Sequence, residues 1–175
     1  MSTSQHTLAL PEAGICFREL LAYTDYLAHR WMNYFGENPG ALEVEIGGRT
    51  PHVRDLVFHI VLVEQIFANL LHDNKPADPP VVAAQKAERE PRTAENLARL
   101  HQEAHDKLTR YAASARPDDL KQVERLGPAS VTRRKILSQV TLHSTHHWAQ
   151  IAMAVRQAGF PAQRPQDIIV SDVME

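Results

Sequence analysis

Three histidines lie within five residues of one another in the segment LHSTHHWAQIA, residues 142–152, with apolar residues on both sides. His143 and His147 are four residues apart, so in a helix their rings lie one turn apart over the same point. His146 is rotated by about 100° from His147 and points toward a flank. The spacing therefore predicts two imidazoles on one buried helix face.

A third histidine, His59, is expected on another buried helix face, between Leu56 and Val63. Buried imidazoles need partners for their ring nitrogens, and a divalent metal ion is such a partner because neutral imidazole is a good ligand. We therefore predict that His59, His143 and His147 bind one metal ion; the alternative is a set of hydrogen-bonded core histidines.

Three protein ligands leave open positions on the ion, which favours catalysis or ligand capture over a purely structural site. Gln150 is the predicted contact to a cofactor or ligand at the open position, with packing against the first helix as the alternative. We expect zinc or nickel, ahead of iron, manganese or cobalt.

Other polar residues are weaker candidates. His101 and His105 share the four-residue spacing, but polar neighbours surround them, so we interpret them as a flanking, mostly solvated pair and as the second choice for metal ligands. Glu64 and His52 are interpreted as helix-surface residues that could at most edge the cavity. Packing roles are expected for Trp31, Trp148 and the single cysteine, Cys16.

The elements that position these residues are helices, because apolar residues recur at steps of three and four. Thr50 and Pro51 suit the N-cap and first position of the second helix. The segment between the third and fourth helices is expected to be a loop with a short hairpin. The predicted class is all-α, a four-helix bundle, with helices at residues 12–35, from 50 onward, 93–115 and 131–157.

The connection between the second and third helices carries topological information, since it is long and holds four prolines. About 20 residues can stretch to roughly 60 Å, whereas a 20-residue helix is about 30 Å long. We therefore predict that residues 72–92 cross the length of the domain and that the second and third helices run parallel.

The chain has 175 residues and a net charge of −2, which suits one domain over residues 1–175 and gives no basic field for nucleic acid or anionic lipid. No apolar run approaches the roughly 20 residues that span a bilayer, and the first residues lack the pattern of a signal peptide. A cytoplasmic protein is expected.

The segments HSTHHWAQ, VRDLVFHIVLVEQIFANLL and ELLAYTDYLAHRWMNYF, with QDII near the end, resemble the last, second and first helices and the closing segment of the DinB/YfiT-like metalloproteins. The resemblance implies a left-handed four-helix bundle with an up-down-down-up course and a long crossover between helices two and three. It also implies a metal held by three histidines, here His59, His143 and His147, and frequent homodimers. Trp148 and Ala149 depart from the family's frequent Arg-Gly.

Members of known activity act on substrates with low-molecular-weight thiols such as bacillithiol, mycothiol or glutathione. The expected function is thus a metal-dependent enzyme that activates such a thiol, or water, for transfer or isomerisation, that is, a thiol S-transferase or a hydrolase. The alternative is a non-catalytic metal- or small-molecule-binding stress-response protein. A carboxylate-bridged di-iron bundle is excluded because no glutamate is followed three residues later by histidine.

Overall fold

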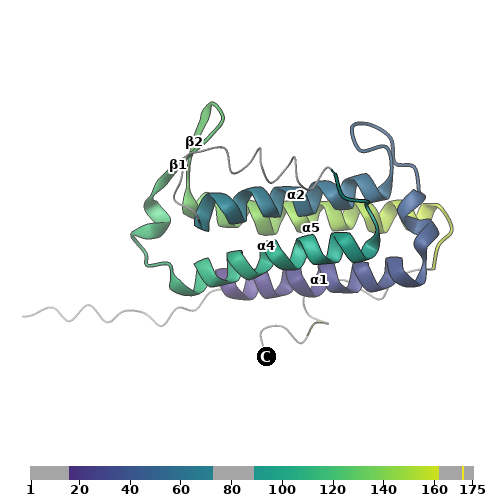
Figure 1. The fold of residues 1–175 in the computed structure, drawn as a ribbon, viewed down its shortest axis with the longest axis horizontal. Coiled ribbons are helices and arrows are strands. Elements are labelled where there is room, and N and C mark those ends of the chain that lie inside the picture. The colour runs from purple at the N-terminus through teal and green to yellow at the C-terminus, as the bar shows by residue number, and fades with distance from the viewer. Residues whose placement is uncertain (1–15, 73–88, 162–170, 172–175) are drawn as a thin grey trace, which may run out of the picture.

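The protein is described by a computed structural model that covers residues 16–72, 89–161 and Ser171. Four long helices within these residues pack side by side as a bundle (Figure 1). Their ends agree with the predicted segments to within three residues, except that α1 begins at Phe17 where residue 12 was predicted. The helices are α1 (Phe17–Glu37), α2 (Val53–His72), α4 (Ala94–Ser114) and α5 (Arg133–Gln157), with two short 3₁₀ helices at Pro39–Glu43 and Asp119–Lys121.

The start of α2 differs from the prediction that Thr50 is its N-cap. The helix begins at Val53, because the residues before it form a narrow loop instead. The Pro51 carbonyl accepts the N–H groups of Ile46 and Gly47, and His52 pairs with Glu45 as an isolated antiparallel bridge. These bonds hold the chain in an extended conformation that a helix could not adopt.

The direction of each helix follows from its contacts. Gln65 and Asn69 of α2 bond to Leu100 and Lys107 of α4, so residue numbers rise together and the two helices run parallel. Helix α4 runs antiparallel to α1, because Leu21 contacts His105 and Asp25 contacts His101. Helix α5 runs parallel to α1, because one apolar cluster contains the early residues of both helices and the other contains the late residues of both. The up-down-down-up course is confirmed; the predicted crossover lies largely outside the described residues.

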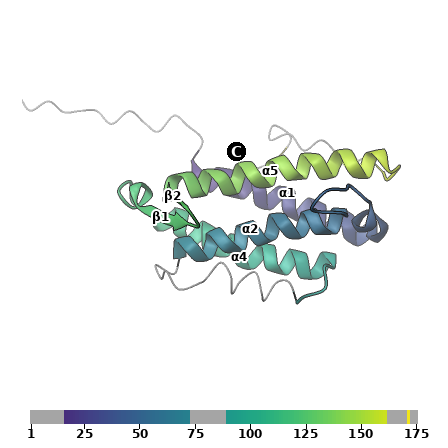
Figure 2. The same ribbon diagram turned by 90° about the horizontal axis from the view of Figure 1, so that it is seen from above.

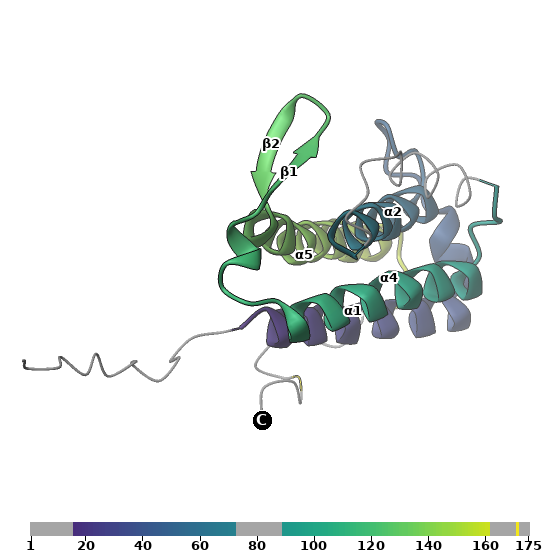
Figure 3. The same ribbon diagram turned by 60° about the vertical axis from the view of Figure 1, so that its left-hand side comes forward.

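Around the bundle, α4 packs against α1 and α2, and so does α5. Figure 2 accordingly shows α4 and α5 at opposite edges with the other two helices between them. The predicted hairpin is present: β1 (Val123–Leu126) pairs antiparallel with β2 (Ala129–Thr132) through a turn in which Gly127 has a φ of +58°. It projects from the bundle where α5 begins (Figure 3). None of the described helices has the length and apolarity needed to cross a membrane.

The core is divided along the bundle axis into two apolar clusters. One contains Trp31 and Trp148, and the other contains Phe67 and Leu137. Between them lies a buried polar layer to which each helix contributes one side chain. We call this set the polar layer; its members are Thr24, Glu64, His101 and Ser144.

Candidate metal centre

Three histidine side chains from two helices converge beside the polar layer. The Nε2 atom of His143 lies 3.1 Å from Nε2 of His59 and 3.2 Å from Nε2 of His147. One ring nitrogen from each residue lies within 4.8 Å of the others, and all three residues are half-buried. The structure thus brings together the three residues that the sequence predicted as a metal site.

The charge state of these rings suits a metal. Burial, followed by the neighbouring charges of His147 and His59, lowers the pKa of His143 to about 4. Burial and His147 likewise lower the pKa of His59 below its ordinary value. Two of the rings are therefore neutral at pH 7, and a neutral imidazole offers a lone pair to a cation.

Gln150 orients one of the rings. Its Oε1 atom lies 2.6 Å from Nδ1 of His147, so Nδ1–H donates to the amide and leaves the Nε2 lone pair facing the cluster. The amide nitrogen donates to Nε2 of His146 at 3.1 Å. Gln150 therefore acts on a histidine in this structure, and the predicted contact between Gln150 and a bound ligand stays a prediction.

The distances between the nitrogens agree with a shared ion. Histidine nitrogens lie about 2.0–2.1 Å from zinc, so two of them at tetrahedral positions are about 3.3 Å apart. The observed separations of 3.1 and 3.2 Å are close to this value. Two nitrogen lone pairs at this distance repel each other unless a proton or a cation lies between them, and the protons of three neutral rings cannot fill every such gap. The three histidines could hold one divalent ion with open positions.

Glu64 is not a surface residue, and that prediction is wrong. Glu64 is 3% exposed. Its carboxylate accepts hydrogen bonds from the hydroxyl of Ser144 at 2.8 Å and from a ring N–H of His101 at 2.7 Å. The acid is tolerated in the interior because both oxygens are bonded and a cation is adjacent. The inward side of α2 thus carries an acid as well as His59.

His101 is also buried, at 2% exposure, and the side chain of His105 is only 13% exposed. The predicted solvated pair is therefore wrong for both members. The Nε2 atom of His101 lies 3.2 Å from Oδ1 of Asp25. Burial lowers the pKa of His101, but the carboxylates of Glu64 and Asp25 outweigh it and raise the pKa to about 10. Both nitrogens of His101 are therefore protonated at pH 7.

This protonation decides between two groups of possible ligands. Asp25, His29 and His101 also lie close enough together to share an ion. An imidazolium has no lone pair for a metal, and both His101 nitrogens already donate to carboxylates. The group of His59, His143 and His147 is therefore the better candidate for a metal centre.

Comparison with known proteins places the chain. The model of the DinB family matches residues 8–166. The chain belongs to the DinB family. A crystal structure of a DinB-like protein of Bacillus subtilis, YjoA, matches with a TM-score of 0.53 and 18% identity, over 86% of this chain and 93% of that one. The likeness supports the fold. A search of curated proteins finds no match.

This DinB-family chain has a tryptophan, Trp148, at the position next to the ligand candidate His147. Trp148, which directly follows His147, is 1% exposed and stacks on Trp31 with ring centroids 5.9 Å apart. The expected packing role of both tryptophans is confirmed. A residue with this orientation points into the core, so position 148 contributes no charged contact to the site.

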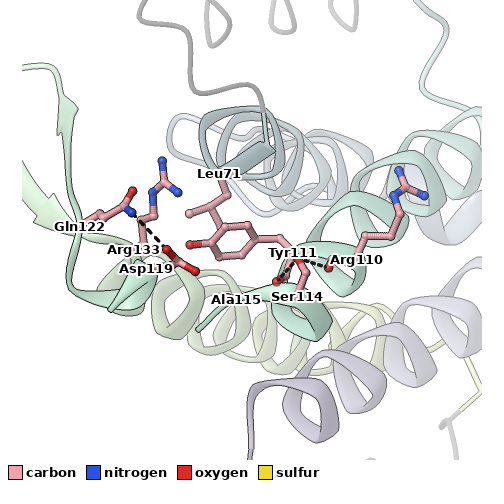
Figure 4. A pocket seen from close by; sticks show the side chains of 8 residues that line it. All are labelled: Leu71, Arg110, Tyr111, Ser114, Ala115, Asp119, Gln122 and Arg133. Atoms are coloured by element: carbon pink, nitrogen blue, oxygen red, sulfur yellow. Dashed lines mark hydrogen bonds between the residues drawn. The ribbon is translucent and has the colours of Figure 1, made fainter. Parts of the chain in front are cut away.

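The cavities formed by the described residues include one away from the histidine cluster and one beside it. A cavity of about 390 Å³ lies between the end of α4 and the start of α5, lined by Tyr111, Arg133 and Asp119 among others (Figure 4). It shares no lining residue with the histidine cluster. A smaller cavity of about 250 Å³ is lined in part by His59 and so adjoins the metal centre.

His52 does not lie on a helix surface, and it does not line this smaller cavity itself, although its neighbour Pro51 does. It lies in the loop before α2, half-buried, and its Nδ1 is 3.2 Å from the carboxylate of Asp55. Asp55 in turn lines the cavity. The sequence missed this because a proline-containing start of helix was expected at the place where the loop bridge forms.

Proposed function

We propose that this protein is a metal-dependent enzyme that binds a small thiol at the open side of a divalent ion. The observation that carries the proposal is the convergence of three half-buried imidazole nitrogens, from His59, His143 and His147, at 3.1 and 3.2 Å. The family's thiol chemistry, implied by the resemblance, supports the substrate class. Zinc or nickel is the proposed ion.

The residues have distinct parts in this proposal. His59, His143 and His147 would hold the ion, and Gln150 keeps His147 in the tautomer that presents Nε2. A bound divalent ion lowers the pKa of a thiol or water that reaches it and so supplies a nucleophile at neutral pH. The apolar walls of α2 at Phe58 and Leu62 would exclude bulk water from one side of that position.

A second candidate function is metal or small-molecule binding without catalysis. One observation favours it: Glu64, the buried acid of this region, already uses both carboxylate oxygens on Ser144 and His101. A general base must lie within hydrogen-bond reach of its substrate, whereas Glu64 is 3% exposed and directed at Ser144 and His101. Binding without turnover would therefore need no further residue.

The first experiment measures metal content. Untagged wild-type protein should retain about one equivalent of divalent ion after desalting. Alanine at His59, His143 or His147 should lower the affinity at least tenfold, since removing one ligand leaves two. His29→Ala is the control, because it removes a histidine of α1 that is 56% exposed and lies outside the cluster. Full retention by the triple variant would overturn the assignment of the site.

The second experiment tests the thiol. Cobalt-substituted protein titrated with small thiols should develop sulfur-to-metal charge-transfer absorption. Absence of this band at saturation with every thiol would overturn the thiol proposal and leave water activation or simple binding. Turnover with a panel of thiols and electrophiles then separates the enzyme from the binding protein.

We also propose that the chain forms a homodimer. Leu142 and Met153, 69% and 51% exposed, lie three turns apart on the outward face of α5. Sedimentation should give twice the chain mass for wild type. The variant Leu142→Asp should shift the protein toward monomer, and a monomeric wild type would overturn this proposal.

A further inference from the structure

The cavity beside His59 has a charged wall. Arg49 and Arg92 line it together with Asp55, while Phe58 and Leu62 supply an apolar side. At about 250 Å³ it is smaller than the roughly 300–1,000 Å³ of pockets for drug-sized ligands, so its size suits a small molecule.

One of the two arginines is already neutralised. Arg92 pairs with the Asp55 carboxylate and lies over the ring of Phe58, 4.3 Å from the centroid. Burial raises the pKa of Asp55, but the backbone N–H of His52 and the guanidinium of Arg92 outweigh it and keep the pKa below its usual value. Asp55 and Arg92 thus form an ion pair whose net charge is zero, so this pair does not attract an anionic ligand.

Arg49 has no such partner. Within residues 16–72 and 89–161 it makes no ion pair or side-chain hydrogen bond, in contrast to Arg54 nearby, which pairs with Glu43. Among the described residues that line the cavity, Arg49 is therefore a positive charge without a carboxylate partner. The N-terminal end of α2, directly after this loop, adds the positive end of the helix dipole.

The loop that carries Arg49 is held in place. Gly47 and Gly48 have φ values of +75° and +72°, which residues with side chains rarely adopt. The loop is closed by the bonds from Ile46 and Gly47 to the Pro51 carbonyl. This turn places a guanidinium on the wall of the same cavity that His59 lines.

Resting on the proposed function, we infer that Arg49 binds the carboxylate of the substrate. The substrate class is then a small thiol that carries a carboxylate a few bonds from sulfur. Its sulfur would approach the centre formed by His59 and its partners, and its carbon chain would lie against Phe58 and Leu62. An arginine fork suits this task because it donates two parallel hydrogen bonds to a carboxylate.

The test uses matched pairs of thiols with cobalt-substituted protein. Mercaptoacetate, 3-mercaptopropionate and 4-mercaptobutyrate are each titrated beside the alcohol of equal chain length, and the charge-transfer band gives the dissociation constants. We expect at least one acid to bind about tenfold more tightly than its alcohol. In Arg49→Gln this preference should vanish while the alcohol binds as before.

Arg134→Gln is the control, since Arg134 is an exposed arginine of α5 that does not line the cavity. It should keep the preference, and Arg49→Lys should keep part of it. The inference is overturned if acids and alcohols bind alike to wild type, if Arg49→Gln weakens both equally, or if Arg134→Gln also removes the preference. No band with any thiol would instead overturn the proposed function itself, together with this inference that rests on it.

Discussion

His101 and His143 are two histidines of one bundle interior with opposite charge states. His101 lies between the carboxylates of Glu64 and Asp25, and its pKa rises to about 10. His143 lies beside two other imidazoles, and burial with their charges lowers its pKa to about 4. The partners, rather than burial alone, decide which histidine is a cation and which can bind one.

The cation at His101 should be essential to stability. His101→Ala leaves the buried Glu64 without its counter-charge, and breaking a buried pair costs about 3–5 kcal/mol. Urea unfolding of wild type and variant measures the difference. His29→Ala removes a side chain that is 56% exposed and should cost less than about 1 kcal/mol. A small loss for both variants would contradict the role of the buried pair.

The same residue predicts a pH dependence. The folded pKa of His101 is about 10 and its ordinary value is 6.5, so its contribution to stability is full below about pH 6.5 and is lost as pH rises through about 10. The pH dependence from Asp25 has the opposite sign. Burial raises the pKa of Asp25, but the hydrogen bond to His101 and the nearby histidine charges outweigh it and lower the pKa below 3.8, so the contribution of Asp25 to stability is lost as pH falls through that lowered pKa. The difference in unfolding free energy between wild type and His101→Ala should therefore shrink from pH 6 to pH 10. A difference independent of pH would contradict the assignment.

At this scale the sequence predicted the three converging histidines but not the polar layer. Helix periodicity places His143 and His147 on one face without knowledge of any other helix. Glu64 and His101 lie at the edges of their apolar stripes, where a charged side chain is usually solvated. Their burial depends on each other across two helices, and a single-helix pattern has no information about such a pair.

At the scale of elements, helix boundaries could be predicted from the sequence where an N-cap residue directly precedes the apolar stripe. Thr93 and Thr132 accept backbone N–H groups of the first turns of α4 and α5, close to the predicted starts. It failed at Thr50, where the loop bridge between Glu45 and His52 competes with the helix. Pairing with another segment overrides a helix-start signal that is only local.

The cap of α5 can be tested by substitution. The Thr132 hydroxyl accepts the Lys135 N–H at 3.2 Å, and losing such a cap costs about 1 kcal/mol. Thr132→Ala should lower the unfolding free energy by this amount. Thr132→Ser retains the oxygen and should restore most of it, whereas an equal loss in both variants would assign the effect to packing of the methyl group.

For the whole molecule, the histidine cluster joins α2 to α5, which have opposite directions. An ion that binds only the folded chain stabilises it by about 2.7 kcal/mol at a hundredfold excess over Kd. For a chain of this size that is a rise of about 5–10 °C in Tm. Zinc or nickel should produce this rise in wild type and a chelator should reverse it. In His143→Ala, where the affinity is at least tenfold lower, the rise should be about half as large or smaller, and an equal rise there would place the ion elsewhere.

The stacked tryptophans make this chain its own optical probe. Trp31 and Trp148 are the only two in the sequence, their rings are inclined by 8°, and each is 1% exposed. Within the described residues neither indole N–H has a hydrogen-bond partner, so emission should be blue-shifted as in an apolar medium. All indole fluorescence thus arises next to His147. Cobalt or nickel, which quench nearby fluorophores, should dim it in proportion to occupancy in wild type and leave His147→Ala bright.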